Sequence, residues 1–71
     1  MRSLSAKEII RILKANGFVI VRQRGSHVIL KNSVSDFMVS VPLHGGNKPI
    51  PIGTFHAIVK QSHISKDTFS K

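Results

Sequence analysis

The alternation of apolar and polar positions predicts an amphipathic helix over residues 4–17. Three apolar side chains recur there at helical spacing: Ile9, Ile10 and Leu13. Ser5 and Glu8 have the spacing of a capping box, in which each side chain accepts a hydrogen bond from the other residue's backbone amide. Gly17 marks the end of this helix, because glycine takes the left-handed conformation of a helix C-terminus at no steric cost.

Three segments rich in β-branched and aromatic residues follow this helix and predict strands. We expect them over residues 18–23, about 26–32 and 37–41, with a turn at Arg24-Gly25 and a polar connection over residues 32–36. The links between consecutive strands are short. An antiparallel meander is therefore predicted.

A second helix is predicted to begin at Gly53-Thr54, after the irregular residues 43–51. Its apolar stripe consists of Phe55, Ile58 and Val59, and one more helical turn is expected from Ser65 to Phe69. The element order predicts a single α+β domain over residues 1–71, with the order α-β-β-β-α. Both helices are expected on one face of a three-stranded antiparallel sheet.

The first two predicted strands are apolar at both alternating positions, as in Phe18 to Val21 and Val28 to Leu30. Two short helices cover only one face of a sheet, and a face left in water usually carries polar side chains. Either another protein binds the open face, or the last helical turn wraps around it. We expect a protein partner.

The charge balance points to a polyanionic partner. Eleven Lys and Arg oppose three Asp and Glu, which gives a formal net charge of +8. Nucleic acid is the first candidate partner and an acidic protein the second, while a basic domain without a polyanion ligand is the alternative. The cations are spread along the chain, so we expect them on a folded surface and not in a disordered arm.

Composition also indicates the compartment. There is no cysteine, and no apolar run approaches the length of a membrane span. The first residues lack the apolar core of a signal peptide. We therefore expect a soluble, cytoplasmic protein.

His27 follows the basic run Arg22-Gln23-Arg24 and the residues Gly25-Ser26, at the mouth of the second predicted strand. Three roles are open to it: a strand histidine that packs or caps a turn, a metal ligand, or a general acid/base. A metal site would need further ligands, and neither a cysteine nor a carboxylate lies nearby in the sequence. An imidazole flanked by arginines suits phosphodiester cleavage in RNA, because imidazole changes charge near neutral pH and guanidinium groups stabilise an anionic phosphorane.

Two other segments are candidates for phosphate contacts. Gly45-Gly46-Asn47-Lys48 offers backbone amides and a positive charge, although a glycine pair in a loop is more often only a turn. Gly53-Thr54 would direct free amides and the helix dipole toward a phosphate, and capping alone explains Thr54 equally well. One helix face is predicted to carry further basic side chains, for which a solvated surface is the simplest account: His56, Lys60 and His63.

Several motifs, in their order and spacing, resemble the HicA toxins, which are YcfA-like mRNA interferases of HicA/HicB toxin–antitoxin systems. These motifs are Ser5-Ala6-Lys7-Glu8, Asn16-Gly17-Phe18, Arg24 before Gly25-Ser26-His27, the loop histidine His44, and Ile50-Pro51-Ile52-Gly53-Thr54. The resemblance covers about residues 4–65. It implies a double-stranded-RNA-binding-like fold.

Carried over by position, the resemblance implies that His27 is catalytic in metal-independent, cofactor-free cleavage of translated mRNA. It also implies growth arrest and neutralisation by an acidic HicB-type antitoxin that covers the active site. Neither a membrane nor DNA is expected as a partner of this chain alone. Residues expected to contact RNA are Arg22, Arg24, Gly25, Ser26, Lys48 and Thr54.

The second proton-transfer group of such a reaction is not supplied by any motif. His44 is the candidate, with loop positioning or RNA backbone contact as the alternative role. Two other functional classes stay open at this point. One is a non-catalytic double-stranded-RNA-binding module, which reads A-form shape and phosphates. The other is an adaptor protein that uses the apolar open face.

Overall fold

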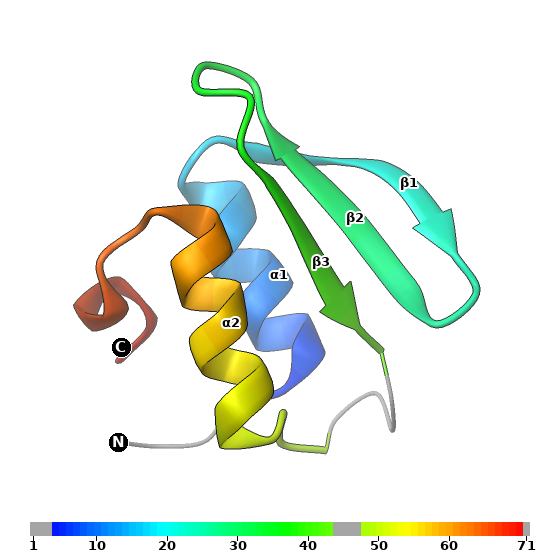
Figure 1. Cartoon of the computed structure of the whole chain (residues 1–71), viewed down its shortest axis with the longest axis vertical. Coiled ribbons are helices and arrows are strands. Elements are labelled where there is room, and N and C mark those ends of the chain that lie inside the picture. The colour runs from blue at the N-terminus through cyan, green and yellow to red at the C-terminus, as the bar shows by residue number, and fades with distance from the viewer. Residues whose placement is uncertain (1–3, 44–47, 71) are drawn as a thin grey trace.

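The computed structural model describes residues 4–43 and 48–70, and its elements follow the predicted order (Figure 1). These elements are α1 (Ala6–Ala15), β1 (Phe18–Arg24), β2 (His27–Asn32), β3 (Met38–Pro42), α2 (Ile52–Ser62) and the short 3₁₀ helix η1 (Lys66–Ser70). The α+β, double-stranded-RNA-binding-like prediction is confirmed. No helix among the described residues combines the length and apolar character that crossing a membrane requires.

The first helix has the capping box that its sequence predicts. The Glu8 amide donates to Ser5 Oγ at 3.3 Å, and the Ser5 amide donates to Glu8 Oε1 at 3.0 Å, which completes the capping box. At the other end Gly17 has a φ of +92°, in the region that favours glycine. A Cβ at Gly17 would also lie 3.3 Å from Asn32 Nδ2, so the close approach of α1 to the end of β2 depends on this glycine.

The sheet is an antiparallel meander in the order β1-β2-β3. Its boundaries differ from the prediction by one residue at the first hairpin: β1 extends to Arg24, and the turn consists of Gly25 and Ser26. β3 includes Pro42, which pairs with His27 at the end of the ladder. This is a position that proline tolerates, because its missing N–H removes no ladder bond from the interior of a sheet.

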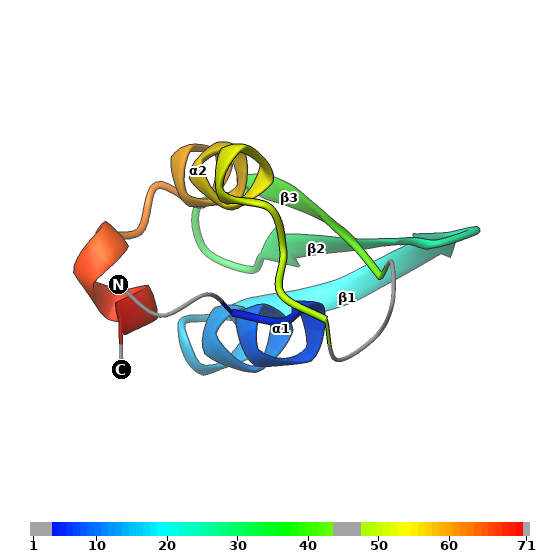
Figure 2. The same ribbon diagram turned by 90° about the horizontal axis from the view of Figure 1, so that it is seen from below.

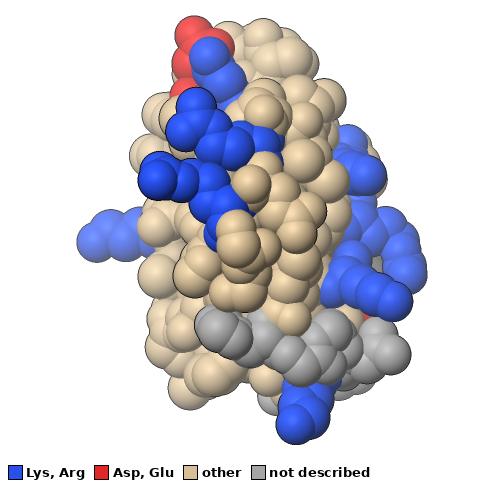
Figure 3. All heavy atoms as spheres, turned by 90° about the vertical axis from the view of Figure 1, so that its right-hand side faces the viewer, with Lys and Arg blue, Asp and Glu red and all other residues tan. Residues whose placement is uncertain are grey.

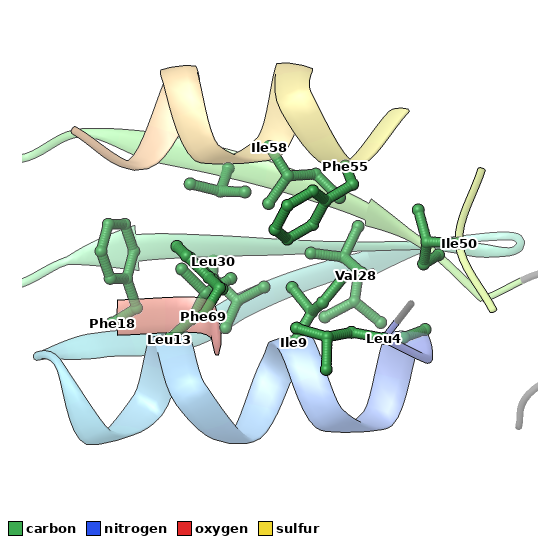
Figure 4. Close-up of a cluster of buried hydrophobic side chains, with 13 residues drawn as sticks. Leu4, Ile9, Leu13, Phe18, Val28, Leu30, Ile50, Phe55, Ile58 and Phe69 are labelled. Carbon is green, nitrogen blue, oxygen red and sulfur yellow. The ribbon is translucent and has the colours of Figure 1, made fainter. Parts of the chain in front are cut away.

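The core fills the space between one face of the sheet and the two helices (Figure 4). Val28 and Leu30 of β2 are buried there with the apolar stripes of α1 and α2. Phe69 of η1 is fully buried and packs edge-on against Phe55, with ring centroids 5.7 Å apart. The predicted last turn is confirmed, and it packs against α1 and the core.

The other face of the sheet, called here the open face, is not covered by the described residues. It carries the side chains that alternate with the buried ones: Val19, Arg22, Arg24, His27, Ile29, Lys31, Met38, Ser40 and Pro42. Val19 and Met38 are about half exposed, at 51% and 53%. The alternative in which the last helical turn wraps around this face is therefore wrong, because η1 lies on the helix side of the molecule (Figure 2).

The end of the β1–β2 hairpin projects beyond both helices (Figures 1 and 2). As a result β1 is buried only at Phe18, and its remaining residues are exposed on both faces. The apolar residues Val19, Ile20 and Val21 of β1 are therefore left about half exposed. The hairpin end is the part of the fold that carries His27.

Candidate active site

His27 is the first residue of β2 and is exposed at the end of the projecting hairpin. The turn before it has a positive φ at Gly25, of 58°, which is the first of its two residues. This pattern favours glycine in hairpin turns. The Leu43 amide donates to the Ser26 carbonyl at 2.6 Å and ties the turn to the end of β3. The backbone at His27 is thus held on both sides, by pairing with Arg24 and with Pro42.

A β-bulge determines which residues of β1 share a face with His27. Ile20 pairs with Leu30, but Arg22 and not Val21 pairs with Ile29, so Val21 is an additional residue in the ladder. In a regular strand, Arg22 would lie on the same face as the core-facing Phe18. The bulge reverses the alternation and brings Arg22 to the open face.

Arg24 therefore lies directly across the ladder from His27, and Arg22 lies one row further along the same face. Lys31 lies on the same face, one row beyond Arg22, and forms an ion pair with Asp36 at 3.6 Å. Figure 3 looks onto the right-hand side of the molecule in Figure 1 and shows Lys and Arg side chains in separate groups, with uncharged residues between them. The predicted placing of arginines beside His27 is thus found in the structure.

On its other side His27 borders a groove between β3 and α2, called here the α2–β3 groove. Its volume is about 520 Å³, and its lining residues are His27, Ser40, Pro42, Gly53, Thr54, Ala57, Ile58 and Gln61. The groove brings His27 together with Gly53 and Thr54, which are separated from it by the whole of β2 and β3. Two predicted site segments thus form one surface.

The N-terminus of α2 forms one end of this groove. The helix begins at Ile52, one residue before the predicted start, and its N-cap is Pro51, which provides no side-chain cap. Thr54 is the third helical residue, so the interpretation of Thr54 as the capping residue is wrong. The first amides of a helix have no intrahelical acceptor and lie at the positive end of the helix dipole. This end of the groove therefore suits an anion such as a phosphate.

Two predicted parts of the site remain, Lys48 and the segment that begins at His44. Lys48 is exposed and precedes Pro49, which pairs with Ser5 at the start of α1, and it is not among the residues that line the α2–β3 groove. Its role in steering a phosphate stays a prediction. His44 and the segment Gly45-Gly46-Asn47 lie outside the described residues.

The predicted basic face of the second helix is only partly correct. His56 and Lys60 are exposed on α2, but His63 lies beyond the helix end as its C-cap, with a φ of 59°. Its ring stacks on Phe37, with ring centroids 3.7 Å apart. His63 therefore packs against the residue before β3 and does not continue a solvated helix face.

Sequence reasoning missed several residues of the groove, namely Ser40, Pro42, Ala57 and Gln61. A partial signal was present, because Ser40 alternates with the apolar Val39 and Val41 and so marks the open face of β3. Gln61 follows Gly53 by two full helical turns along the same side of α2, yet nothing in the sequence shows that this side borders β3.

Chemically, the groove combines an imidazole, a helix N-terminus whose first amides have no intrahelical acceptor, and nearby arginines. No three His, Cys, Asp or Glu side chains gather at a potential metal site within residues 4–43 and 48–70. A histidine beside bound phosphate can take or give a proton at the phosphate's ester oxygens. The guanidinium groups of Arg22 and Arg24 supply positive charge on the open-face side.

Comparison with known families agrees with this geometry. The family described as "HicA toxin of bacterial toxin-antitoxin" has a sequence model that matches residues 6–64 of the 71 residues. The match runs from the first residue of α1 to just beyond the end of α2, and so includes the sheet and the whole α2–β3 groove. A comparison with curated proteins gave no match. The chain belongs to the HicA toxin family and is a toxin of a bacterial toxin–antitoxin system.

Proposed function

We propose that this toxin is a metal-independent endoribonuclease that cleaves mRNA with His27 as its acid–base group. The observation that carries the proposal is the position of His27 in the α2–β3 groove. There it faces the N-terminus of α2 on one side and lies across the ladder from Arg24 on the other. The groups for proton transfer and phosphate binding would thus come from β1, β2 and α2, which meet at this place.

The reaction that fits this arrangement is transesterification at phosphorus. The ribose 2′-oxygen forms a bond to phosphorus while the bond from phosphorus to the 5′-oxygen breaks. The 2′-hydroxyl loses a proton, and the leaving 5′-oxygen gains one. His27 would take the first proton or give the second, while the amides at Gly53 and Thr54 and the guanidinium of Arg24 stabilise charge on the phosphorane.

One histidine transfers both protons only in successive steps, so a second group would let the two transfers occur together. His44 is the candidate for that group, on the segment that follows Leu43. Leu43, which precedes His44 in the sequence, donates its amide to the Ser26 carbonyl beside His27.

A toxin of this class has an antitoxin partner, and we infer a HicB-type antitoxin that covers the His27 site. The half-exposed apolar side chains of the open face, Val19 and Met38, lie in the same surface as Arg22, Arg24 and Lys31. Apolar contacts ringed by cations suit an acidic protein with apolar anchors. We place the site of action in the cytoplasm, where translated mRNA is found.

A non-catalytic double-stranded-RNA-binding module is the second candidate function. One observation favours it: among the described residues that line the α2–β3 groove, His27 is the single acid–base group. Such a module needs phosphate contacts and shape recognition across successive minor grooves, and it needs no proton transfer.

Induced expression separates these two functions. We expect the wild-type chain to stop growth and to cut cellular RNA, while His27→Ala stops neither growth nor translation and still binds RNA in vitro. Equal toxicity of wild type and His27→Ala would contradict the role of His27. RNA binding without cleavage by the wild type would favour the non-catalytic module.

A further inference from the structure

The far end of the α2–β3 groove holds a side-chain amide whose orientation is set by the backbone. The Ser40 amide donates to Gln61 Oε1 at 3.3 Å. Because a backbone N–H is always a donor, the atom that receives this bond must be the amide oxygen of Gln61 and not its nitrogen. The two N–H donors of Gln61 Nε2 are thus left for the groove. The structure shows no hydrogen bond from this nitrogen to any residue that it describes.

The bond is a consequence of the way in which α2 lies along β3. β3 is one of the two edge strands of the sheet, and its Ser40 amide is on the side away from β2. An unpaired edge amide needs an acceptor, and Gln61 supplies one from the neighbouring helix. This contact fixes both the position and the orientation of the Gln61 side chain at the groove.

The groove has polar groups at its two ends and apolar groups between them. His27, Gly53 and Thr54 form one end, and Ser40 and Gln61 form the other, because β3 and α2 run in opposite directions (Figure 1). Gly53 and Gln61 are separated by roughly 12 Å along the helix, at 1.5 Å per residue. Pro42 lies beside His27 as its partner in the ladder, and Ala57 and Ile58 add apolar surface along the helix side of the groove.

These dimensions fit a nucleotide whose phosphate lies at the His27 end and whose base lies against the apolar surface. A volume of about 520 Å³ is in the range of sites that hold small ligands. We propose that the Ser40–Gln61 end of the groove binds a nucleobase through its keto oxygen. The proposal rests on the proposed ribonuclease function for the presence of RNA in the groove.

The direction of the preference follows from the donor-only character of Gln61 Nε2. A glutamine whose oxygen and nitrogen are both free pairs with adenine, which offers an acceptor and a donor. With Oε1 held by Ser40, Gln61 offers donors alone. Uracil O4 and guanine O6 accept from such a group, whereas the amino groups of cytosine and adenine at the same positions repel it.

Uracil and cytosine give the cleanest comparison, because they are pyrimidines of the same size whose Watson–Crick edges carry opposite groups: O4 and N3–H in uracil, N4–H2 and an unprotonated N3 in cytosine. The experiment measures binding of two fluorescent ten-nucleotide probes, one of uridine and one of cytidine, both 2′-O-methylated so that they cannot be cleaved. At equal salt concentration we expect wild-type chain to bind the uridine probe about tenfold more tightly, as for one discriminating base contact. We also expect His27→Ala to keep this preference, since the base contact lies at the other end of the groove.

Two variants at position 61 test the assignment. Gln61→Glu keeps an acceptor for the Ser40 amide but loses both donors, so the preference should reverse toward the cytidine probe. Gln61→Met removes donors and acceptor together, so the two probes should bind equally. Thermal unfolding of each variant checks that β3 and α2 stay packed, and Gln61→Glu, which retains the edge contact, is the variant expected to fold normally.

Equal binding of the two probes by wild type would overturn the proposal, as would a uridine preference that survives Gln61→Met, or no binding of either probe. Failure of the ribonuclease function has a different signature. In that case unmethylated RNA would stay intact while the uridine preference and its reversal by Gln61→Glu persist, and the base site would stand without the catalysis.

Discussion

Arg24 and His27 face each other across the last pair of the β1–β2 ladder, as the end of one strand and the start of the next. The pair joins the permanent positive charge of a guanidinium to the imidazole of the proposed acid–base residue. Arg24 shares this face with Arg22 because the bulge at Val21 reverses the alternation of β1. The basic character of the site is thus a property of strand register and not only of composition.

Replacement of Arg24 should weaken RNA binding through loss of a phosphate contact. For Arg24→Ala we expect lower affinity and a salt dependence whose slope falls by about 0.7 to 1, the amount for one lost contact. Arg11→Ala is the matched control, because Arg11 is exposed on α1 and away from the open face. Fluorescence anisotropy over a series of salt concentrations measures both, and equal effects of the two variants would show that only net charge matters.

Two single-residue deletions test the role of the bulge. Deletion of Val21 removes the additional residue and leaves Arg22 opposite Ile29, so RNA binding and cleavage should survive. Deletion of Gln23 keeps the turn but moves Arg22 opposite Val28, on the core side of the sheet, so RNA affinity should fall. The two deletions shorten the hairpin equally, and binding titrations of both proteins are the measurement. Similar affinities for the two deletions would contradict the assignment of faces.

Phe69 tests whether the last turn is part of the folded domain. Its side chain is fully buried and contacts Phe55, so Phe69→Ala should destabilise the protein by about 3–5 kcal/mol. A loss of this size is a large fraction of the stability of so small a domain. Urea unfolding measures it, with Val34→Ala as control, since Val34 is 91% exposed and should change little. An unchanged unfolding midpoint in Phe69→Ala would mean that η1 does not pack as described.

The apolar side chains of the open face should matter for inhibition more than for cleavage. Met38 lies two rows from His27 on this face, is 53% exposed and lines a shallow hollow with Arg22 and Arg24, so Met38→Glu should lower RNA cleavage by less than it lowers neutralisation. A negative charge there should repel an acidic antitoxin and weaken neutralisation of the toxin. Growth during co-expression with the protein encoded in the neighbouring reading frame is the measurement, and Val34→Glu is the control for the added charge. Full neutralisation of Met38→Glu would place the antitoxin elsewhere.

Local signals in the sequence predicted most of the fold. The capping box at Ser5 and Glu8 and the glycine at position 17 set the limits of α1 by short-range hydrogen bonds and backbone preference. These effects depend on neighbours in the chain, so the sequence alone reveals them. The start of α2 was placed one residue late because Pro51 caps it through its backbone position, with no side-chain hydrogen bond that a capping pattern would show.

The site was less predictable, because it depends on contacts between distant segments. The sequence indicated His27 and Thr54 separately, but their common groove follows from the packing of α2 along the edge of β3. The bulge at Val21 has no signal in a run of β-branched residues, where each position suits a strand equally well. Gln61 was missed because its role depends on a contact with Ser40, which lies 21 positions away in the chain.

The most direct test of the catalytic role of His27 is the single-turnover cleavage rate of a synthetic RNA by purified protein in EDTA. The proposed mechanism predicts that wild type cleaves under these conditions and that His27→Ala is slower by about 10²-fold or more, as for loss of a general acid–base group, while RNA affinity changes little. A His27→Ala rate within a few-fold of wild type, or a wild-type rate abolished by EDTA, would contradict the account.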